Sequence, residues 1–109
     1  MKKLNALQIE KYDINQKIIK ILTDLESRTI LFSIVSKAKS AEDISRENKI
    51  PMTTVYKKLN ELAKFTLIKI ERIGFANRGP TIKYYKSRVS QAQISFRRLE
   101  PKLILYKNY

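Results

Sequence analysis

Apolar residues in the first third of the chain recur every three or four positions, as they do on one face of an α-helix. We therefore expect a first helix at about 6–22 and a second at about 25–37, with Asp24 capping the second. The apolar positions are Leu7, Ile14, Ile18, Ile21 and Leu22 in the first helix, and Ile30, Leu31, Ile34 and Val35 in the second. Two amphipathic helices of this kind can begin a core.

The segment that follows has the pattern of two short helices joined by a tight turn. Ser40 stands where a helix N-cap belongs, with the acidic Asp43 three positions later, and this pair predicts a helix at about 40–48. Pro51 cannot continue that helix but suits the start of another, which we expect at about 51–65. The spacing is typical of a helix-turn-helix.

The helix expected at 51–65 has one apolar face and one polar face. The apolar face is made by Val55, Leu59 and Leu62, and Met52 is expected to fill the core. The polar face and its flanks carry Thr53, Thr54, Tyr56, Lys57, Asn60 and Lys64. Such hydroxyl, amide and ammonium groups suit contacts to phosphates and base edges, although an ordinary surface helix is polar on its outer face too. For Tyr56 the alternative is packing with its hydroxyl exposed.

Two segments rich in Ile and Tyr, 67–73 and 81–87, predict the strands of a β-hairpin. The segment between them contains the chain's only two glycines and forms a long tip. Tyr84, Tyr85 and Phe75 are candidates for an aromatic platform that binds single-stranded nucleic acid. Because side chains alternate along a strand, one of the two tyrosines should instead pack on the helices.

The C-terminal segment has a second pair of apolar runs, at 93–97 and 102–106. They resemble another hairpin, with a short helix as the alternative. Ile94, Phe96, Leu103 and Leu105 provide its apolar side chains.

Residues 50–62, with the sequence IPMTTVYKKLNEL, and the LIKI that follows at 67–70 resemble the winged helix-turn-helix transcriptional regulators. The resemblance is to the ArsR-like group, especially its small metal-free type common in archaea. LTDLESRTIL at 22–31 and YYKS at 84–87 extend the similarity to about residues 22–88.

The resemblance implies an α+β fold with about four helices and a β-hairpin wing, to which the C-terminal runs add an extra hairpin. It implies that helix 51–65 enters the major groove of DNA and that the wing, 67–87, lies on the backbone or in the minor groove. Many members of the group carry Cys or His metal ligands. This chain has neither residue, so we expect no metal and no cofactor.

The charge of the chain, net +13, is concentrated at its C-terminal end. Residues 72–109 hold nine basic residues and Glu100 as the only acid, whereas residues 27–71 hold nine basic and five acidic ones. A general solubilising charge is the alternative to a phosphate-binding surface. The candidates for DNA contacts on and beside the wing are Arg72, Asn77, Arg78 and Lys83, with Lys86 and Arg88 nearby.

Catalysis finds little support in the sequence, and we expect a protein that is not an enzyme. Without His or Cys, acid–base chemistry would need carboxylates, and the nearest acidic pairs fall at expected helix starts, where the macrodipole favours them. The Gly74–Gly79 segment lacks the glycine spacing of a phosphate loop.

At 109 residues the chain is expected to form one domain, with an N-terminal helix (1–24), a winged-helix core (25–88) and a C-terminal extension (89–109). No apolar run approaches the roughly 20 residues that span a bilayer, so we expect no membrane contact and a cytoplasmic, nucleoid-associated protein.

These observations favour a sequence-specific regulator that binds double-stranded DNA. The alternatives are an architectural, chromatin-type protein with little sequence preference and a protein-interaction module on a winged-helix fold. A homodimer is expected through the N-terminal helix, the C-terminal segment or both, because the first helix has more apolar width than one core-facing stripe requires. Its heptad-like seam is Leu4, Leu7, Ile14, Ile18 and Ile21.

Overall fold

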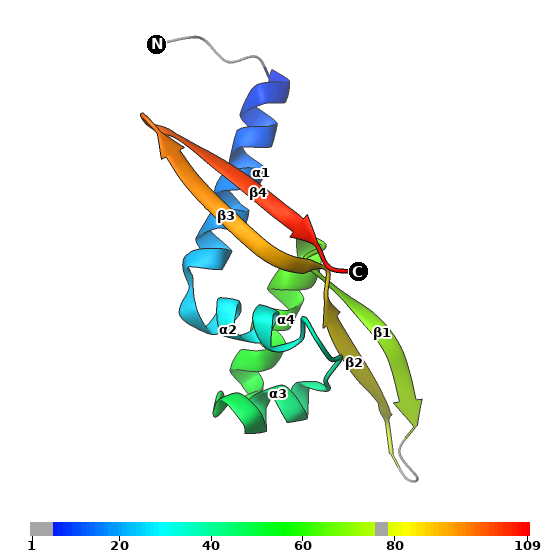
Figure 1. The fold of residues 1–109 in the computed structure, drawn as a ribbon. Helices are drawn as coiled ribbons and strands as arrows, with labels where there is room; N and C mark the ends of the chain where they lie inside the picture. Colours follow the sequence, from blue (N-terminus) through cyan, green and yellow to red (C-terminus); the bar gives the residue numbers. More distant parts are fainter. Residues whose placement is uncertain (1–5, 76–78) are drawn as a thin grey trace.

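A computed structural model describes the backbone of residues 6–75 and 79–109 and the side chains of residues 14–75 and 79–109. Over these residues the chain forms four helices followed by four strands (Figure 1). The helices are α1 (Ala6–Thr23), α2 (Leu25–Ser33), α3 (Ala41–Asn48) and α4 (Met52–Lys64). The strands are β1 (Ile68–Phe75), β2 (Thr81–Ser87), β3 (Val89–Arg97) and β4 (Glu100–Lys107). The α+β fold with a hairpin wing is therefore confirmed.

The core lies where the C-terminal half of α1 meets the other three helices. Ile18, Ile21 and Leu22 of α1 are buried, as expected from their spacing. Ile14 is exposed, so the buried part of α1 begins one turn after it, at Ile18. The side chains of Leu4 and Leu7 lie outside the described residues. The fully buried side chains at the centre are Ile30, Leu31, Ile34, Ile44, Val55, Leu59 and Leu62.

Helix α2 begins at its predicted cap but ends four residues before the predicted end at 37. The Oδ2 atom of Asp24 accepts a hydrogen bond from the Ser27 amide at 3.0 Å. After Ser33 the backbone turns to the wing, because the carbonyl of Ile34 accepts from the Ser87 amide at 2.9 Å. Lys39 and Tyr85 then exchange two backbone hydrogen bonds, of 3.0 and 2.8 Å. Because the backbone after Ser33 bonds to strand β2, it does not continue the helix.

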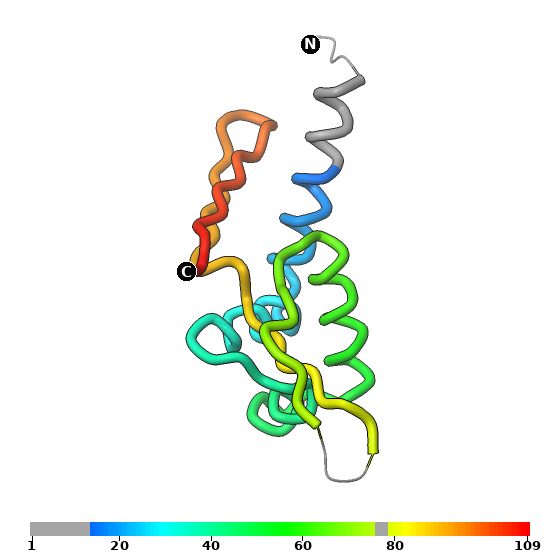
Figure 2. The backbone as a smooth tube through the Cα atoms, turned by 90° about the vertical axis from the view of Figure 1, so that its right-hand side faces the viewer, coloured from blue at the N-terminus to red at the C-terminus, as the bar shows by residue number. Residues whose placement is uncertain are grey.

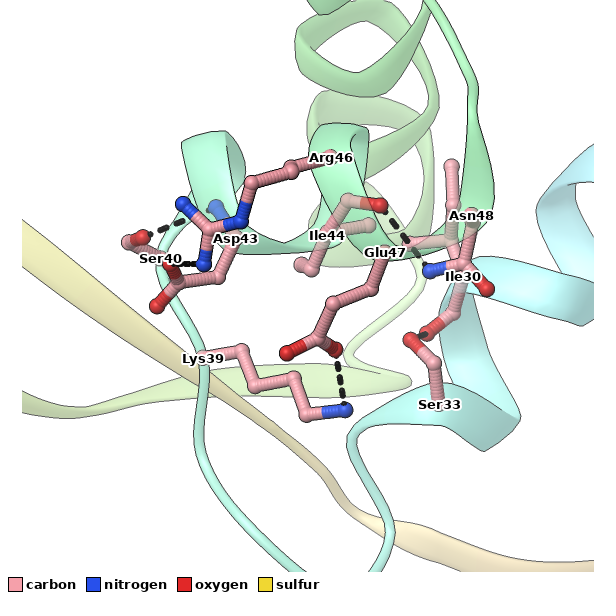
Figure 3. Close-up of polar contacts among 9 residues, drawn as sticks. All are labelled: Ile30, Ser33, Lys39, Ser40, Asp43, Ile44, Arg46, Glu47 and Asn48. Carbon is pink, nitrogen blue, oxygen red and sulfur yellow. Dashed lines mark hydrogen bonds and ion pairs between the residues drawn. The ribbon is translucent and has the colours of Figure 1, made fainter.

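Helix α3 is capped as predicted, and a tight turn follows it. Figure 3 shows the Oγ atom of Ser40 beneath the first turn, where it accepts from the Asp43 amide at 3.1 Å. At the other end Lys49 takes the left-handed conformation, with φ 55°. The Ser45 hydroxyl donates to the Ile50 carbonyl at 2.5 Å, while the Ile50 amide donates to the Ser45 carbonyl at 3.1 Å. These bonds fix the turn of the helix-turn-helix.

Helix α4 spans 13 residues and is one residue shorter at each end than predicted. Pro51 is its N-cap, not its first residue, and its carbonyl accepts from the Val55 amide at 3.0 Å. Met52 is 37% exposed, so the expectation that it fills the core was wrong. At the other end Thr66 adopts a φ of 56°, and its amide and that of Leu67 close the last turn.

The two hairpins extend in opposite directions from the helices, as Figures 1 and 2 show. The wing, β1–β2, leaves the end of α4, while β3–β4 folds back along α1. This second hairpin confirms the predicted strands over the alternative helix and is longer than predicted at both ends. Asn108, just after it, anchors the junction, because its Nδ2 donates to the carbonyls of Val35 and Ser87, both at 2.9 Å.

Candidate nucleic-acid interface

The packing of α4 decides which of its side chains face solvent. Val55, Leu59 and Leu62 are buried against the other helices, which fixes the rotation of the helix about its axis. Five of the six polar candidates are exposed, and Thr54 is half-buried at the edge of the face. The polar face proposed from the sequence therefore exists as one surface along α4. Its members are Thr53, Thr54, Tyr56, Lys57, Asn60 and Lys64.

The first turn of α4 adds main-chain groups to this surface. No side chain caps its amides, because the N-cap is Pro51. The first amides of a helix and the positive end of its dipole favour an anion such as a phosphate. Thr53 is exposed beside them and contributes a hydroxyl donor. Uncapped amides and a hydroxyl donor at this end of α4 suit a phosphate.

A contact from α2 holds α4 in place. The Nζ atom of Lys58 lies 3.0 Å from Oδ2 of Asp24, the residue that caps α2. Hydrogen bonds from the Ser27 hydroxyl and from Lys58 lower the pKa of Asp24 to about 2. The hydrogen bond to Asp24 also raises the pKa of Lys58. Lys58 is thus engaged within the protein, unlike the exposed Lys57 beside it.

A β-bulge sorts the side chains of the wing into two faces. Ile70 pairs with Tyr85 and Arg72 with Tyr84, so Glu71 is the extra residue. Cross-strand partners share a face, and successive residues of β2 lie on opposite faces. The apolar wing face carries Ile70, Ile73, Phe75, Thr81, Lys83 and Tyr85. The basic wing face carries Lys69, Arg72, Gly74, Ile82, Tyr84 and Lys86.

On the basic wing face, the ring of Tyr84 is covered from within the hairpin. The guanidinium carbon of Arg72 lies 4.0 Å from the ring centre, in cation–π geometry. The ring also lies against Gly74, where an added Cβ would come within 3.0 Å of Tyr84 Cε2. Arg72 keeps its charge and its donors in this position, and Lys69 and Lys86 lie on the same face.

Tyr85, on the apolar wing face, packs against the core. Burial raises the pKa of its phenol, and the neighbouring Tyr56 of α4 raises it further. The prediction that one tyrosine of the pair packs on the helices is therefore confirmed, and the base of the apolar wing face adjoins α4. Tyr84 and Tyr85 face apart, so with Phe75 they form no continuous aromatic platform.

The structure separates the wing candidates instead of gathering them. Arg72 lies on the basic wing face and Lys83 on the apolar one. Asn77 and Arg78 lie outside the described residues. Lys69 was not among the candidates for contact and Lys86 was named only as lying nearby, although both share a face with Arg72. Alternation alone would have placed Lys69 and Arg72 on opposite faces, and only the bulge at Glu71 brings them together.

Among the side chains of residues 14–75 and 79–109, no group of three or more His, Cys, Asp or Glu residues is placed to hold a metal ion. No helix within residues 6–75 and 79–109 has the length and apolar character to cross a membrane.

Two solved structures share this fold at low sequence identity. The crystal structure of NolR from Sinorhizobium fredii superposes with a TM-score of 0.65 at 20% identity, over 80% of this chain and 81% of NolR. The second is the solution structure of the homodimeric winged helix-turn-helix DNA-binding domain of Mb0332 from Mycobacterium bovis, a possible ArsR-family transcriptional regulator. It superposes with a TM-score of 0.63 at 20% identity, over 80% of this chain and 75% of that domain. The fold is a winged helix-turn-helix.

No protein-family model matches the sequence, and no curated protein matches it significantly. The likeness is therefore one of fold.

Proposed function

We propose that this chain is a transcriptional regulator that binds double-stranded DNA, with α4 in the major groove and the wing on the backbone or in the minor groove. The observation that carries the proposal is the orientation of α4. Its buried stripe turns Thr53, Lys57 and Asn60 outward, beside a first turn that no side chain caps. Hydroxyl, ammonium and amide groups in that position can contact phosphates and base edges together.

The charge of the chain supports a polyanionic partner. Residues 68–88 contain six basic residues and one acid, Glu71. Arg72, Lys83 and Lys69 are exposed on the two wing faces, where they can reach phosphates on either side of the hairpin. A solubilising charge would not need to be concentrated at the C-terminal end of the chain, where residues 72–109 contain one acid.

A specific regulator of the ArsR-like, metal-free type is the finer form of the proposal. One of the two structural neighbours is described as a possible ArsR-family regulator, and the absence of His and Cys from the sequence leaves no thiolate or imidazole ligands for a metal sensor. Such a protein would act in the cytoplasm, on the nucleoid. An architectural protein is the alternative, because a net charge of +13 also suits DNA binding with little sequence preference.

We further propose a homodimer, in which α1 and the β3–β4 extension of the winged-helix core face a second copy. Two-stranded hairpins are only marginally stable alone, and β3–β4 packs on the rest of the chain from its base to about its middle. There Ile94 and Leu103 pack on the core of their own chain. Farther out Phe96 is 69% exposed, and Ile14 on α1 is exposed as well. A partner subunit would cover these side chains.

The salt dependence of binding tests the proposal. With about six phosphate contacts per dimer, affinity for duplex DNA should fall on the order of a thousandfold between 50 and 200 mM salt, since each contact adds about −0.9 to the log–log slope. A flat response would contradict DNA binding. Selection from a random duplex pool then distinguishes a sequence-specific regulator from an architectural protein. A specific dimer should enrich an inverted repeat, and an architectural protein should enrich no sequence.

A further inference from the structure

The apolar wing face carries a row of apolar side chains that the fold leaves exposed. Phe75 is 85% exposed, Ile73 is 52% and Ile70 is 45%. The bulge at Glu71 aligns all three on one face, and Phe75 stands at the tip end of β1 opposite Thr81. None of them belongs to the core. Folding therefore gives no reason for a phenylalanine at this position.

The surroundings of the row indicate what covers it. Lys83 is the cross-strand partner of Ile73 on the same face, and Lys69, Arg72 and Lys86 line the reverse face of the hairpin. Glu71 is the only acid between residues 68 and 88. The complementary partner is a polyanion that also offers flat apolar surface. Base pairs stacked between two phosphate backbones have both properties.

The position of the row relative to α4 supports the same partner. Tyr85 continues the apolar wing face down to the helices, where its phenol lies near Tyr56 on the outer surface of α4. The row is thus an extension of the surface that α4 presents. A duplex lying against α4 would meet this side of the wing at the adjacent groove.

We propose that Phe75 acts as an apolar wedge that inserts between base pairs from the minor groove, with Ile73 packing behind it on the sugars. The inference rests on the proposed function, because it concerns the same duplex. A side chain inserted in this way unstacks one step and kinks DNA by roughly 20–90° toward the major groove. It would place this chain among proteins that bend the DNA they bind.

Single-stranded nucleic acid fits the row less well. Binding along a strand needs several aromatic rings on which successive bases stack. The ring of Tyr84 is covered by Arg72 and Gly74, and Tyr85 packs on the core. Phe75 is left as a single ring at the end of a hairpin, and a single ring is suited to one insertion.

The experiment measures DNA bending by the whole chain with a duplex of about 30 base pairs labelled at both ends for energy transfer. The wild-type protein should shorten the end-to-end distance. Phe75→Ala should leave the duplex close to straight and weaken binding by about tenfold, because one stacking contact is lost. Phe75→Leu should retain most of the bend, since leucine also serves as a wedge. Tyr109→Ala is the matched control, because it removes another almost fully exposed aromatic ring and should change neither quantity.

The slope of affinity against salt separates this inference from the proposed function. Phe75→Ala should keep the steep slope of the wild type, because no phosphate contact is removed. A wild-type protein that binds duplex DNA with that slope but leaves it straight would overturn the wedge and not the DNA-binding proposal. No binding to duplex DNA would overturn both. Binding to anionic lipid vesicles that depends on Phe75, with no bending of DNA, would assign the row to a membrane surface and overturn the wedge.

Discussion

The Oδ2 atom of Asp24 accepts hydrogen bonds from both the amide and the hydroxyl of Ser27, at 3.0 and 2.7 Å, and lies 3.0 Å from the Nζ atom of Lys58. One carboxylate thus caps α2 and ties it to α4, which carries the proposed DNA-reading surface. The side chain of Lys58 lies largely within the protein surface, at 18% exposure. The orientation of α4 therefore depends on an ionised group at the start of another helix.

Replacing Asp24 by alanine should lower the free energy of unfolding at pH 7 by about 1–2 kcal/mol. Most of this comes from the lost helix cap, because the Asp24 side chain is 40% exposed and solvent screens the ion pair. Urea denaturation at pH 7 measures the free energy of unfolding of both proteins. Glu71→Ala, on the exposed bulge of the wing, is the control and should change the free energy of unfolding by a few tenths of a kcal/mol at most.

The effect of Asp24 should also depend on pH. Its pKa is about 2 in the folded protein and 3.8 in a model compound, so the carboxylate stabilises the fold fully above pH 3.8. As the pH falls from there toward 2, the group takes up its proton and this stabilisation is lost. Wild type and Asp24→Ala should therefore converge in stability over that range. A difference that stays constant down to pH 2 would show that the charged form of Asp24 plays no part.

The end of α4 contains a strained residue whose replacement should stabilise the protein. Thr66 has a φ of 56°, in the left-handed region that β-branched residues disfavour, and its amide donates to the Ala63 carbonyl at 3.0 Å. Thr66→Gly should raise the free energy of unfolding by about 0.5–1 kcal/mol, since relief of strain exceeds the added entropy of the unfolded chain.

Thermal and urea denaturation of Thr66→Gly give the measurement. Thr81→Gly is the control, because Thr81 is also an exposed threonine but lies in an extended strand, so its replacement should cost stability. Equal destabilisation by both changes would contradict the assignment of strain to Thr66.

The buried stripe and polar face of α4 could be predicted, because helical spacing and the burial of Val55, Leu59 and Leu62 depend on the same local period. The end of α2 could not be predicted from the sequence. The backbone groups of Ile34 and Lys39 bond to strand β2, about 50 residues later, and this long-range pairing ends the helix. The two wing faces could not be predicted either. One extra residue, Glu71, exchanges the faces of everything after it on β1, and neither composition nor alternation indicates where a bulge falls.

The candidate DNA contacts should divide into reading and positioning residues. Asn60→Ala and Lys57→Ala on α4 should weaken binding to a cognate site more than to random DNA, because each lost base contact costs about 1–3 kcal/mol of discrimination. Lys83→Ala and Arg78→Ala should weaken binding to both DNAs alike and reduce the salt slope by about one each. Fluorescence anisotropy on the two duplexes checks this division. Equal losses for all four variants on both DNAs would favour the architectural alternative.

We expect the wing to contact DNA and β3–β4 to contact a second subunit. Substitutions of the exposed phenylalanine on each hairpin test this division. Phe96 on β3 and Phe75 on β1 are both exposed near the ends of two-stranded hairpins, so a glutamate at either position should leave the fold intact. If β3–β4 and α1 form the dimer interface, Phe96→Glu should raise the dimer dissociation constant at least about tenfold. Each subunit would lose a buried phenyl ring worth about 1.5–3 kcal/mol.

Phe75→Glu is the matched control and should dissociate no dimer, because the wing is proposed to face DNA. Analytical ultracentrifugation between 1 and 100 μM resolves the two outcomes. In a dimer the two α4 helices should lie about one DNA turn apart, ~34 Å, so Phe96→Glu should also remove the preference for two half-sites at that spacing. A monomeric wild-type protein would contradict the dimer itself. A dimer weakened by Phe75→Glu and not by Phe96→Glu would place the interface on the wing and leave β3–β4 without a partner.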